Sequence, residues 1–539
     1  MIARQILFSC LVLLGFLGVP SALAADSEPA RVGRLAVVDG DVAAHLPGGE
    51  WTGGEVNDPV FSGVQMRTGA SGRAILRIGA DTVALAAAGT LDVAAFDARG
   101  SDIVLHSGRI GIRLSPMDPS RNVEIDLPGG GVWLSAPGDY DITAGDEHTP
   151  ARVAVFDGRA RLVGKGFDTF VDAGSAAALG GGPATANAEK AAADDFVEWW
   201  RRAAGDDAAG PAAHFLSPDL TGYEALDSDG TWEMVDGYGA VWFPTTAPAG
   251  WAPYRDGHWR WIAPWGWSWI DDMSWGFVTS HYGRWASIPG ADPGTERWGW
   301  VPGDRVAQPK YAPALVAFLG TAGVGLSYPD ASGPAAAWFP LAPGEVYWPS
   351  YTSDPAIIRR INDGSVADLD LIGPAEFRGP PAAIVNGKYQ NRRFASVVPR
   401  AVFLAGLPVA SALVQLPSRR LDNAPLLAGS PQLAPPAPHV AAVASVAGNA
   451  KRVARATTPR LARAMHALAR ILARREPARA RRALVLAHVA PARSAVRVAI
   501  GSHWRAPRLR LLVRPHIISA VASRSARVHL AALHRRWIR

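Results

Sequence analysis

Cysteine is almost missing from this chain of 539 residues, in which Cys10 is the single example. Because Cys10 lies in an apolar run near the N-terminus, the rest of the chain has no disulfide framework, cysteine nucleophile or cysteine-based metal site. Charged residues are also few, at 19% of the chain. Beyond residue 25 no uninterrupted apolar run reaches the roughly 18 residues that a membrane-spanning helix needs. The sequence therefore predicts no transmembrane helix in the mature chain.

Residues 1–24 have the pattern of a cleavable secretory signal peptide. Arg4 supplies the positive charge, an apolar stretch follows, and residues 22–24 form the Ala-Leu-Ala of a cleavage site. Pro20 and the small residues after it favour cleavage over retention as a membrane anchor. No twin-arginine pair is present, which indicates the general export route. The sequence thus predicts a periplasmic or secreted protein.

Positive charge is concentrated at the C-terminal end. Residues 451–539 hold 22 Lys and Arg and one acidic residue, whereas residues 1–450 hold 32 basic and 47 acidic residues. Such a basic tail suits anionic lipid, acidic wall polymers or an acidic face of the same protein, and export makes nucleic acid a poor partner. The alternatives are a disordered or partly helical extension without function, or a shifted reading frame in a GC-rich gene.

Residues 32–175 alternate between apolar and polar positions with the period of a β-strand, and Gly, Asp or Pro interrupts the pattern at short intervals. In residues 73–78, for example, the even-numbered side chains would lie on one face and the odd-numbered ones on the other. Asp157-Gly158, between two such runs, is a hairpin signal. Many short antiparallel strands of this kind predict a β-sandwich or an open β-roll.

Several short motifs follow one another in a definite order within this region. They are Gly40-Asp41-Val42, Arg73-Ala-Ile-Leu-Arg-Ile-Gly79, Leu105-x-x-Gly108-x-Ile110, Val153-Ala-Val155 and Gly158-Arg-Ala160. The region resembles the FecR domain, the periplasmic module of iron-dicitrate-type signalling regulators. Leu127-Pro-Gly-Gly130 departs from the usual Thr-Pro-x-Gly, and the sigma-binding segment and membrane helix of those regulators are missing. The resemblance therefore implies the extracytoplasmic β-fold and not the anti-sigma activity.

Residues 188–204 predict a short connecting helix after an Ala/Gly-rich linker. Two aspartates at 194–195 and two arginines at 201–202 complement the helix dipole. The aromatic residues of the helix fall on roughly one face, which we expect to pack on a neighbour. They are Phe196, Trp199 and Trp200.

Tryptophan gathers in one block, since twelve of the 20 in the chain fall between Trp232 and Trp300. The pattern Trp-Gly-aromatic begins at residues 265, 275 and 298, which indicates a short, hairpin-like internal repeat. Alternating tryptophans would place neighbouring rings on one face of a strand.

The tryptophan block belongs to a longer series of aromatic and glycine motifs. They are Tyr223-Glu-Ala-Leu-Asp227, Gly239-Ala-Val-Trp-Phe-Pro244, Pro264-Trp-Gly-Trp267, Trp275-Gly-Phe277, His281-Tyr-Gly-Arg-Trp285, Gly299-Trp-Val-Pro-Gly303, Tyr311-Ala-Pro-Ala-Leu-Val316 and Trp338-Phe-Pro-Leu-Ala-Pro-Gly-Glu-Val-Tyr347. Residues 217–420 resemble a bacterial family of unknown function marked by Tyr-x-Trp-Gly-x-Trp repeats, although the leading Tyr is absent here. The resemblance implies no activity.

Two interpretations of the tryptophan block stay open. A strand face lined with Trp can stack on sugar rings, with His258, Asp272 and Arg284 as further polar partners. The same rings can fill the core of a small β-domain, and we favour this for most of them because so many exposed rings would promote aggregation. The candidate ligand-binding residues are Trp259, Trp261, Trp265, Trp267, Trp269, Asp271, His281 and Trp285.

No residue pattern supports catalysis. Asp271 and Asp272 are adjacent and would point to opposite faces of a strand, and His258 and His281 lack the spacing of a zinc site. The glycines of residues 320–325 have the reverse of the spacing in the dinucleotide-binding motif Gly-x-Gly-x-x-Gly. The sequence also contains no nucleophile elbow and no phosphate-binding loop. We therefore predict a protein that is not an enzyme, with no catalytic, cofactor-binding or metal-binding residues.

The sequence thus predicts a mainly β protein of the cell envelope. A FecR-like antiparallel domain and a connecting helix precede a Trp/Gly-rich β-domain, which a Pro/Ala-rich linker at 421–450 joins to the basic tail. The predicted function is a non-catalytic binding or scaffold protein that recognises an envelope protein or a cell-wall glycan through exposed Trp or Tyr. The alternative is an envelope signalling accessory related to FecR-type regulators, and a glycan-directed enzyme is a distant third.

Overall fold

The computed structural model describes residues 31–433 with gaps at 98, 117–120, 147, 165, 180–188, 206–209, 249, 291–294, 322–324, 327–333, 374–379, 381–386, 428–430 and 432. The predicted signal peptide (1–24) and basic tail (451–539) lie outside the described residues. All described residues fall in one compact unit that ends at Pro438. This unit is mainly β with several antiparallel sheets, which confirms the predicted fold class. Among the described residues, no helix is both long enough and apolar enough to cross a membrane.

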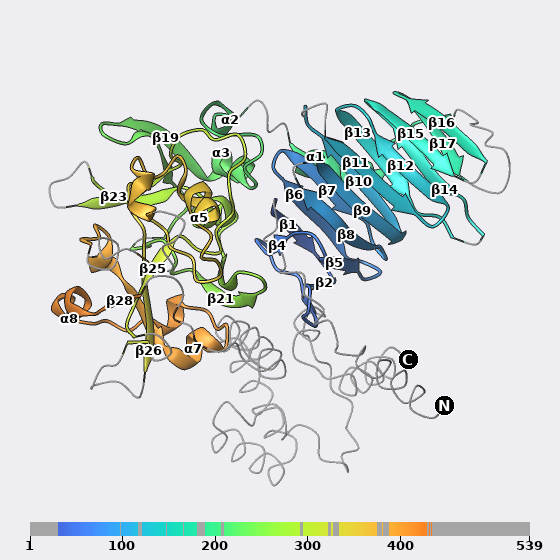
Figure 1. The fold of residues 1–539 in the computed structure, drawn as a ribbon. Coiled ribbons are helices and arrows are strands. Elements are labelled where there is room, and N and C mark those ends of the chain that lie inside the picture. Colours follow the sequence, from blue (N-terminus) through green and yellow to red (C-terminus); the bar gives the residue numbers. More distant parts are fainter. Residues whose placement is uncertain are drawn as a thin grey trace, which may run out of the picture. The chain divides into compact units, whose positions relative to one another are not determined.

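Two large sheets form the first part of the chain (Figure 1). In chain order the strands are β1 (Gly33–Asp39), β2 (Val42–His45), β3 (Trp51–Gly53), β4 (Pro59–Val60), β5 (Gln65–Thr68), β6 (Arg73–Ile78), β7 (Asp81–Leu85), β8 (Thr90–Asp97), β9 (Gly100–Ser107), β10 (Arg109–Leu114), β11 (Asn122–Leu127), β12 (Gly130–Leu134), β13 (Gly138–Thr143), β14 (Ala151–Val155), β15 (Arg159–Gly164), β16 (Phe167–Asp172), β17 (Ser175–Leu179) and β18 (Glu189–Lys190). One nine-stranded sheet has the order β18-β17-β14-β13-β10-β7-β6-β1-β4, and the other has the order β16-β15-β12-β11-β9-β8-β5-β2-β3. Neighbours pair antiparallel, apart from β9 and β11, which are parallel.

The hydrophobic core draws on both sheets. Leu76 of β6 and Val93 of β8, which belong to different sheets, lie in the same buried cluster. Ile75, on the other side of β6, packs in a separate cluster with Trp200. The alternation predicted for residues 73–78 is therefore present, and both sides of the strand are buried.

Helix α1 (Asp195–Ala204) covers the outer side of β6 and is shorter than the predicted helix over 188–204. Its N-terminus is fixed by Asp194, whose carboxylate accepts a hydrogen bond of 3.1 Å from the main-chain N–H of Val197. The residues just before it do not continue the helix, because Glu189–Lys190 pair as the edge strand β18.

The hairpin predicted at Asp157-Gly158 is wrong. The chain does turn there, with Gly158 at a φ of 91°, but β14 and β15 on either side belong to different sheets. The turn is a corner between sheets because β14 already pairs with β13 and β17 on its two edges. A local turn signal specifies the change of direction and not the pairing partner.

The second part of the described chain combines shorter strands with short helices. In chain order the elements are α2 (Ala212–Phe215), η2 (Tyr223–Ala225), α3 (Leu226–Asp229), β19 (Gly230–Val235), β20 (Gly239–Pro244), β21 (Gly257–Ile262), β22 (Gly266–Asp271), α4 (Gly276–His281), β23 (Arg284–Pro289), β24 (Glu296–Val301), β25 (Val316–Leu319), β26 (Ala335–Pro340), α5 (Pro355–Asn362), η3 (Leu369–Ile372), η4 (Arg392–Phe394), β27 (Ser396–Pro399), α7 (Arg400–Leu404), η5 (Ala410–Ala412), α8 (Ser418–Asn423) and β28 (Leu426–Leu427). The strands form three sheets, in the orders β19-β20-β24-β23, β21-β22 and β27-β26-β25-β28.

This part extends beyond residue 420, where the Trp/Gly-rich domain was predicted to end. Leu427 of β28 pairs with Phe318 of β25, and Leu433 is only 2% exposed. The start of the predicted linker at 421–450 is therefore packed against the domain, because its leucines supply apolar contacts that a Pro/Ala count does not reveal. Residues 434–450 of that linker lie outside the described residues.

Candidate functional site

The eight residues predicted to bind a ligand belong mostly to the hydrophobic core. Only Trp261 among them is exposed, at 40%. Trp259 shows why, since its ring meets those of Trp269 and Trp338 edge to face, with centroids 5.5 and 5.3 Å apart. The structure therefore corrects the predicted sugar platform, because seven of its residues are at most 5% exposed. They are Trp259, Trp265, Trp267, Trp269, Asp271, His281 and Trp285.

The two polar members of that set have partners inside the protein. Asp271 accepts hydrogen bonds from Trp269 Nε1 at 2.8 Å and from the N–H of Met273 at 3.0 Å, and burial raises its pKa to about 7. Nδ1 of His281 donates to the carbonyl of Ala312 at 2.7 Å, and burial lowers the pKa of His281 to about 3. His281 is therefore neutral at physiological pH, and both side chains form their hydrogen bonds inside the core.

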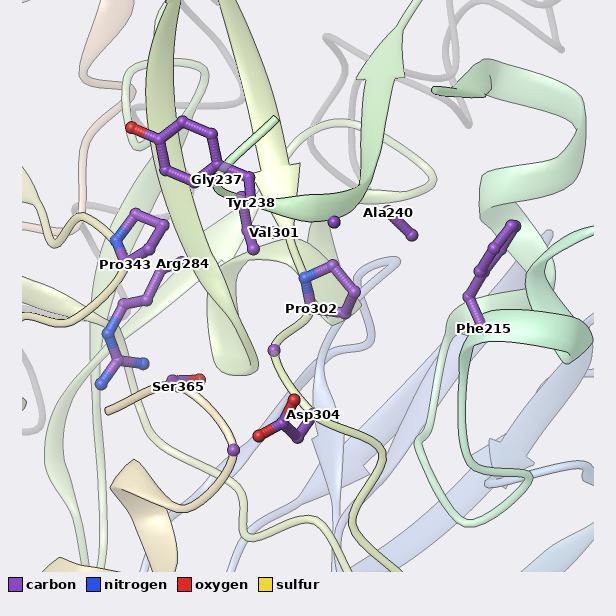
Figure 2. A pocket seen from close by; sticks show the side chains of 13 residues that line it. Phe215, Gly237, Tyr238, Ala240, Arg284, Val301, Pro302, Asp304, Pro343 and Ser365 are labelled. Atoms are coloured by element: carbon purple, nitrogen blue, oxygen red, sulfur yellow. The ribbon is translucent and has the colours of Figure 1, made fainter. Parts of the chain in front are cut away.

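A cavity of about 300 Å³ lies in the second part of the chain (Figure 2). Its walls come from the turn between β19 and β20 with the start of β20 (237–240), from Arg284 at the start of β23 and from the end of β24 with the chain after it (301–304). Pro343 and the segment after α5 (364–365) complete them. Phe215 of α2 adds an aromatic wall. In the view of Figure 2, Ser365 lies between Arg284 and Asp304, while Phe215 lies on the other side.

Arg284 is held in place by three oxygens that carry no full charge. Its Nε donates to the carbonyl of Glu345 at 3.1 Å, Nη1 donates to the carbonyl of Gly283 at 2.8 Å and Nη2 donates to Oδ1 of Asn362 at 2.7 Å. Asn362 is itself fixed, because its Nδ2 donates to the carbonyls of Tyr347 and Ile358. A guanidinium has five N–H donors, so two of them are not needed for these bonds.

Arg284 forms no ion pair with a carboxylate among the described residues, although the nearby Glu345 carboxyl group acts on its charge electrostatically. Its side chain is buried, with 1% of the residue exposed, and no described carboxylate oxygen lies within the 4.0 Å of an ion pair. Burial lowers the pKa of Arg284 to about 10, so the group is still cationic at neutral pH. The Glu345 carboxyl group accepts hydrogen bonds from the N–H groups of Ala342 and Gln390, and burial raises its pKa to about 7. Buried charges normally have a paired counter-ion, whereas Arg284 has only Glu345 beyond ion-pair distance, and the raised pKa of that group leaves it partly protonated near neutral pH.

A smaller cavity of about 40 Å³ adjoins the first. The two share five lining residues, namely Phe215, Pro302, Gly303, Asp304 and Ser365. The smaller cavity also has three basic side chains in its lining, Arg305, Lys310 and Arg360, beside Asp304 and Asp363. Basic residues thus outnumber acidic ones in the lining of the smaller cavity, and their charge would attract an anionic group.

Sequence reasoning reached only part of this site. It named Arg284 as a polar partner of a sugar platform, but it did not single out Phe215, Asp304 or Ser365. The available signal was the position of the glycine motifs, because the motifs ending at Trp285 and Gly303 both contribute to the cavity. The structure shows how the two motifs meet. They lie on the paired strands β23 and β24, in which Arg284 is opposite Val301.

Residues 223–345 match a family of unknown function, DUF6600. The match lies within 217–420, where the sequence predicted a resemblance to a family of unknown function, and it includes most of the cavity walls. A search of curated proteins gave no match. The resemblance of residues 32–175 to the FecR domain stays a prediction.

Two crystal structures from Parabacteroides distasonis ATCC 8503, each provisionally described as an anti-sigma factor, are similar to part of the chain. The TM-score is 0.20 for both, with sequence identities of 12% and 11%. Each match covers 23% of this chain and 56% or 57% of the other, so the chain spans little more than half the length of these structures.

Within the described part of the chain there is no group of three or more His, Cys, Asp or Glu side chains that could hold a metal ion.

Proposed function

We propose that this chain is a non-catalytic binding protein of the cell envelope that holds the anionic group of a small ligand in the Arg284 cavity. The observation that carries the proposal is the buried, cationic Arg284, which lines the cavity, forms no ion pair with a described carboxylate and has only the partly protonated Glu345 as a nearby acidic group. The envelope location rests on the signal-peptide pattern of residues 1–24.

Physical chemistry favours an anion at this position. A buried guanidinium that bonds only to uncharged oxygens has lost its hydration without gaining a full counter-charge. An oxyanion that accepts its two remaining N–H groups would form charge-assisted hydrogen bonds, which are about twice as strong as neutral ones. The binding of an anionic group would thus relieve a cost that the unliganded protein bears.

The test is isothermal titration of the mature chain with acetate, propionate, phosphate and sulfate. We expect saturable binding of at least one anion, which Arg284→Met abolishes. Arg202→Met, which removes an exposed arginine from α1, is the matched control and should leave binding unchanged. Arg284→Lys keeps the charge if the methionine variant does not fold. Failure of every anion to bind, or unchanged binding in both Arg284 variants, would contradict the proposal.

An envelope signalling accessory is the second candidate function. The observation that favours it is a buried ion pair between the two parts of the chain, in which Arg34 Nη2 lies 2.6 Å from Glu224 Oε1. This contact holds the part of the chain that contains the cavity against the region that resembles the FecR domain. Envelope pull-downs with and without a bound anion test this idea, because a signalling role requires a partner whose capture depends on occupancy.

A further inference from the structure

A second charged residue lines the Arg284 cavity. Asp304 lines both cavities and is exposed, and its carboxylate has no hydrogen bond or ion pair with any described residue. Its main chain is nevertheless held firmly, because the N–H of Asp304 donates to the carbonyl of Gly364 at 2.7 Å.

Two glycines make that firm placement possible. Gly303 and Gly364 have φ values of 83° and 74°, and a Cβ on Gly303 would overlap the carbonyl of Gly364. A Cβ on Gly364 would approach the carbonyl of Asp304 to 2.7 Å. The two loops therefore touch backbone to backbone, and this contact fixes Asp304 beside the segment that carries Ser365.

Arg284 and Asp304 thus line the same cavity with opposite charges and do not neutralise each other. Their charged atoms lie farther apart than the 4.0 Å limit of an ion pair. A simple anion at Arg284 would gain from the arginine and would be repelled by the aspartate. A ligand with a negative and a positive end would gain at both.

We infer that the Arg284 cavity binds a small zwitterion, an amino acid whose carboxylate meets Arg284 and whose ammonium group meets Asp304. This inference rests on the proposed function, and it names the ligand class of the same site. The volume of about 300 Å³ is at the lower limit for ligand sites in proteins, which suits a small molecule. Phe215, Val301 and Pro302 supply apolar wall for the short hydrocarbon between the two charges.

The test compares amino acids with carboxylates that lack only the ammonium group. The mature chain is titrated calorimetrically with glycine and acetate, with alanine or β-alanine and propionate, with γ-aminobutyrate and butyrate, and with 5-aminovalerate and valerate. We expect at least one amino acid to bind about fivefold or more tightly than its matched carboxylate, as an additional charge-assisted hydrogen bond implies. The amino acid whose affinity exceeds that of its matched carboxylate by the largest factor shows which separation of ammonium and carboxylate fits Asp304 and Arg284.

The variant that tests the assignment is Asp304→Asn, which alters an exposed side chain and should not disturb folding. It should remove the advantage of the amino acid and leave binding of the matched carboxylate unchanged or slightly tighter. Asp363→Asn is the matched control, because Asp363 lines only the smaller cavity.

The failures of the two proposals are distinguishable. If no carboxylate binds, with or without an ammonium group, the proposed function itself is wrong. If the simple carboxylates bind through Arg284 but the amino acids gain nothing, only the zwitterion inference is overturned. An advantage that persists in Asp304→Asn would also overturn it.

Discussion

The side chain of Asn57 is bonded to the main chain of Asp271, which lies 214 residues farther along the sequence. Its Nδ2 donates to the carbonyls of Asp271 and Met273 at 3.0 and 2.6 Å, and its Oδ1 accepts from Nη1 of Arg34 at 2.9 Å. Asn57 is fully buried and adopts a φ of 72°, which asparagine tolerates better than most residues. One amide thus joins the two-sheet first part of the chain to the tryptophan-rich second part.

Replacement of Asn57 by alanine should lower the free energy of unfolding by about 2–4 kcal/mol, because it leaves buried polar groups without partners and strains the backbone. Asn57→Gly loses the same bonds but tolerates the positive φ, so it should be about 1 kcal/mol less harmful. Urea denaturation of the mature chain measures both. Equal losses for the two variants would show that the backbone conformation contributes nothing, and wild-type stability in both would refute the importance of the junction.

The strand pattern of the first part could be predicted because it is a local property. In Arg73–Ile78 the alternation of side chains follows from the geometry of one strand, and the structure shows both faces as expected. The corner at Gly158 could not be predicted in the same way, because the choice between a hairpin and a change of sheet depends on which edges are already paired.

The candidate site is a product of tertiary structure. Arg284 and Asp304 are 20 residues apart, and β23 and β24 bring them to one cavity, while Phe215 and Ser365 come from distant segments. The abundance of tryptophan drew attention to the core, where the rings cover one another. Arg284 has no such compositional signal, since the lack of an ion pair at its buried charge is visible only in the contacts of the described residues.

Gly111 of β10 lies directly beneath the indole of Trp200, and a Cβ at this position would overlap that ring. Gly111→Ala should therefore displace α1 and destabilise the protein by about 1–3 kcal/mol. Gly129→Ala is the control, because nothing lies within 4 Å of its Cβ position. Urea titrations followed by tryptophan fluorescence compare the two variants. A Gly111 variant as stable as the Gly129 variant would show that the helix is not tightly seated.

The tryptophan pair Trp269 and Trp261 separates the two interpretations of the aromatic block. Trp269 is fully buried and Trp261 is 40% exposed, although both lie in the β21–β22 hairpin. Trp269→Ala should cost about 3–5 kcal/mol, as large aromatic deletions in cores do, whereas Trp261→Ala should cost less than about 1 kcal/mol. Equilibrium unfolding in urea measures each cost. Similar small losses at both positions would favour the sugar-platform interpretation over the core.

His281 should make the protein sensitive to acid. Burial lowers its pKa to about 3 in the folded protein, compared with 6.5 in the unfolded chain. Between these values the unfolded chain binds a proton that the folded protein excludes. The contribution of neutral His281 to the free energy of unfolding is therefore fully present above pH 6.5 and is lost as the pH falls toward 3. Each unit of pH in this window should remove about 1 kcal/mol of stability.

His281→Asn removes the titrating group and should flatten the dependence of unfolding free energy on pH between about 3 and 6.5. The comparison must be made against the wild type, because Asp58 and Asp271 act in the opposite direction. Burial raises their pKa values to about 6 and about 7. Each of the two carboxyl groups therefore lowers the free energy of unfolding as the pH rises and it must ionise inside the protein. His148→Asn, at an exposed position, is the control for loss of a histidine. If the difference between His281→Asn and the wild type is the same at every pH, His281 is not buried in its neutral form.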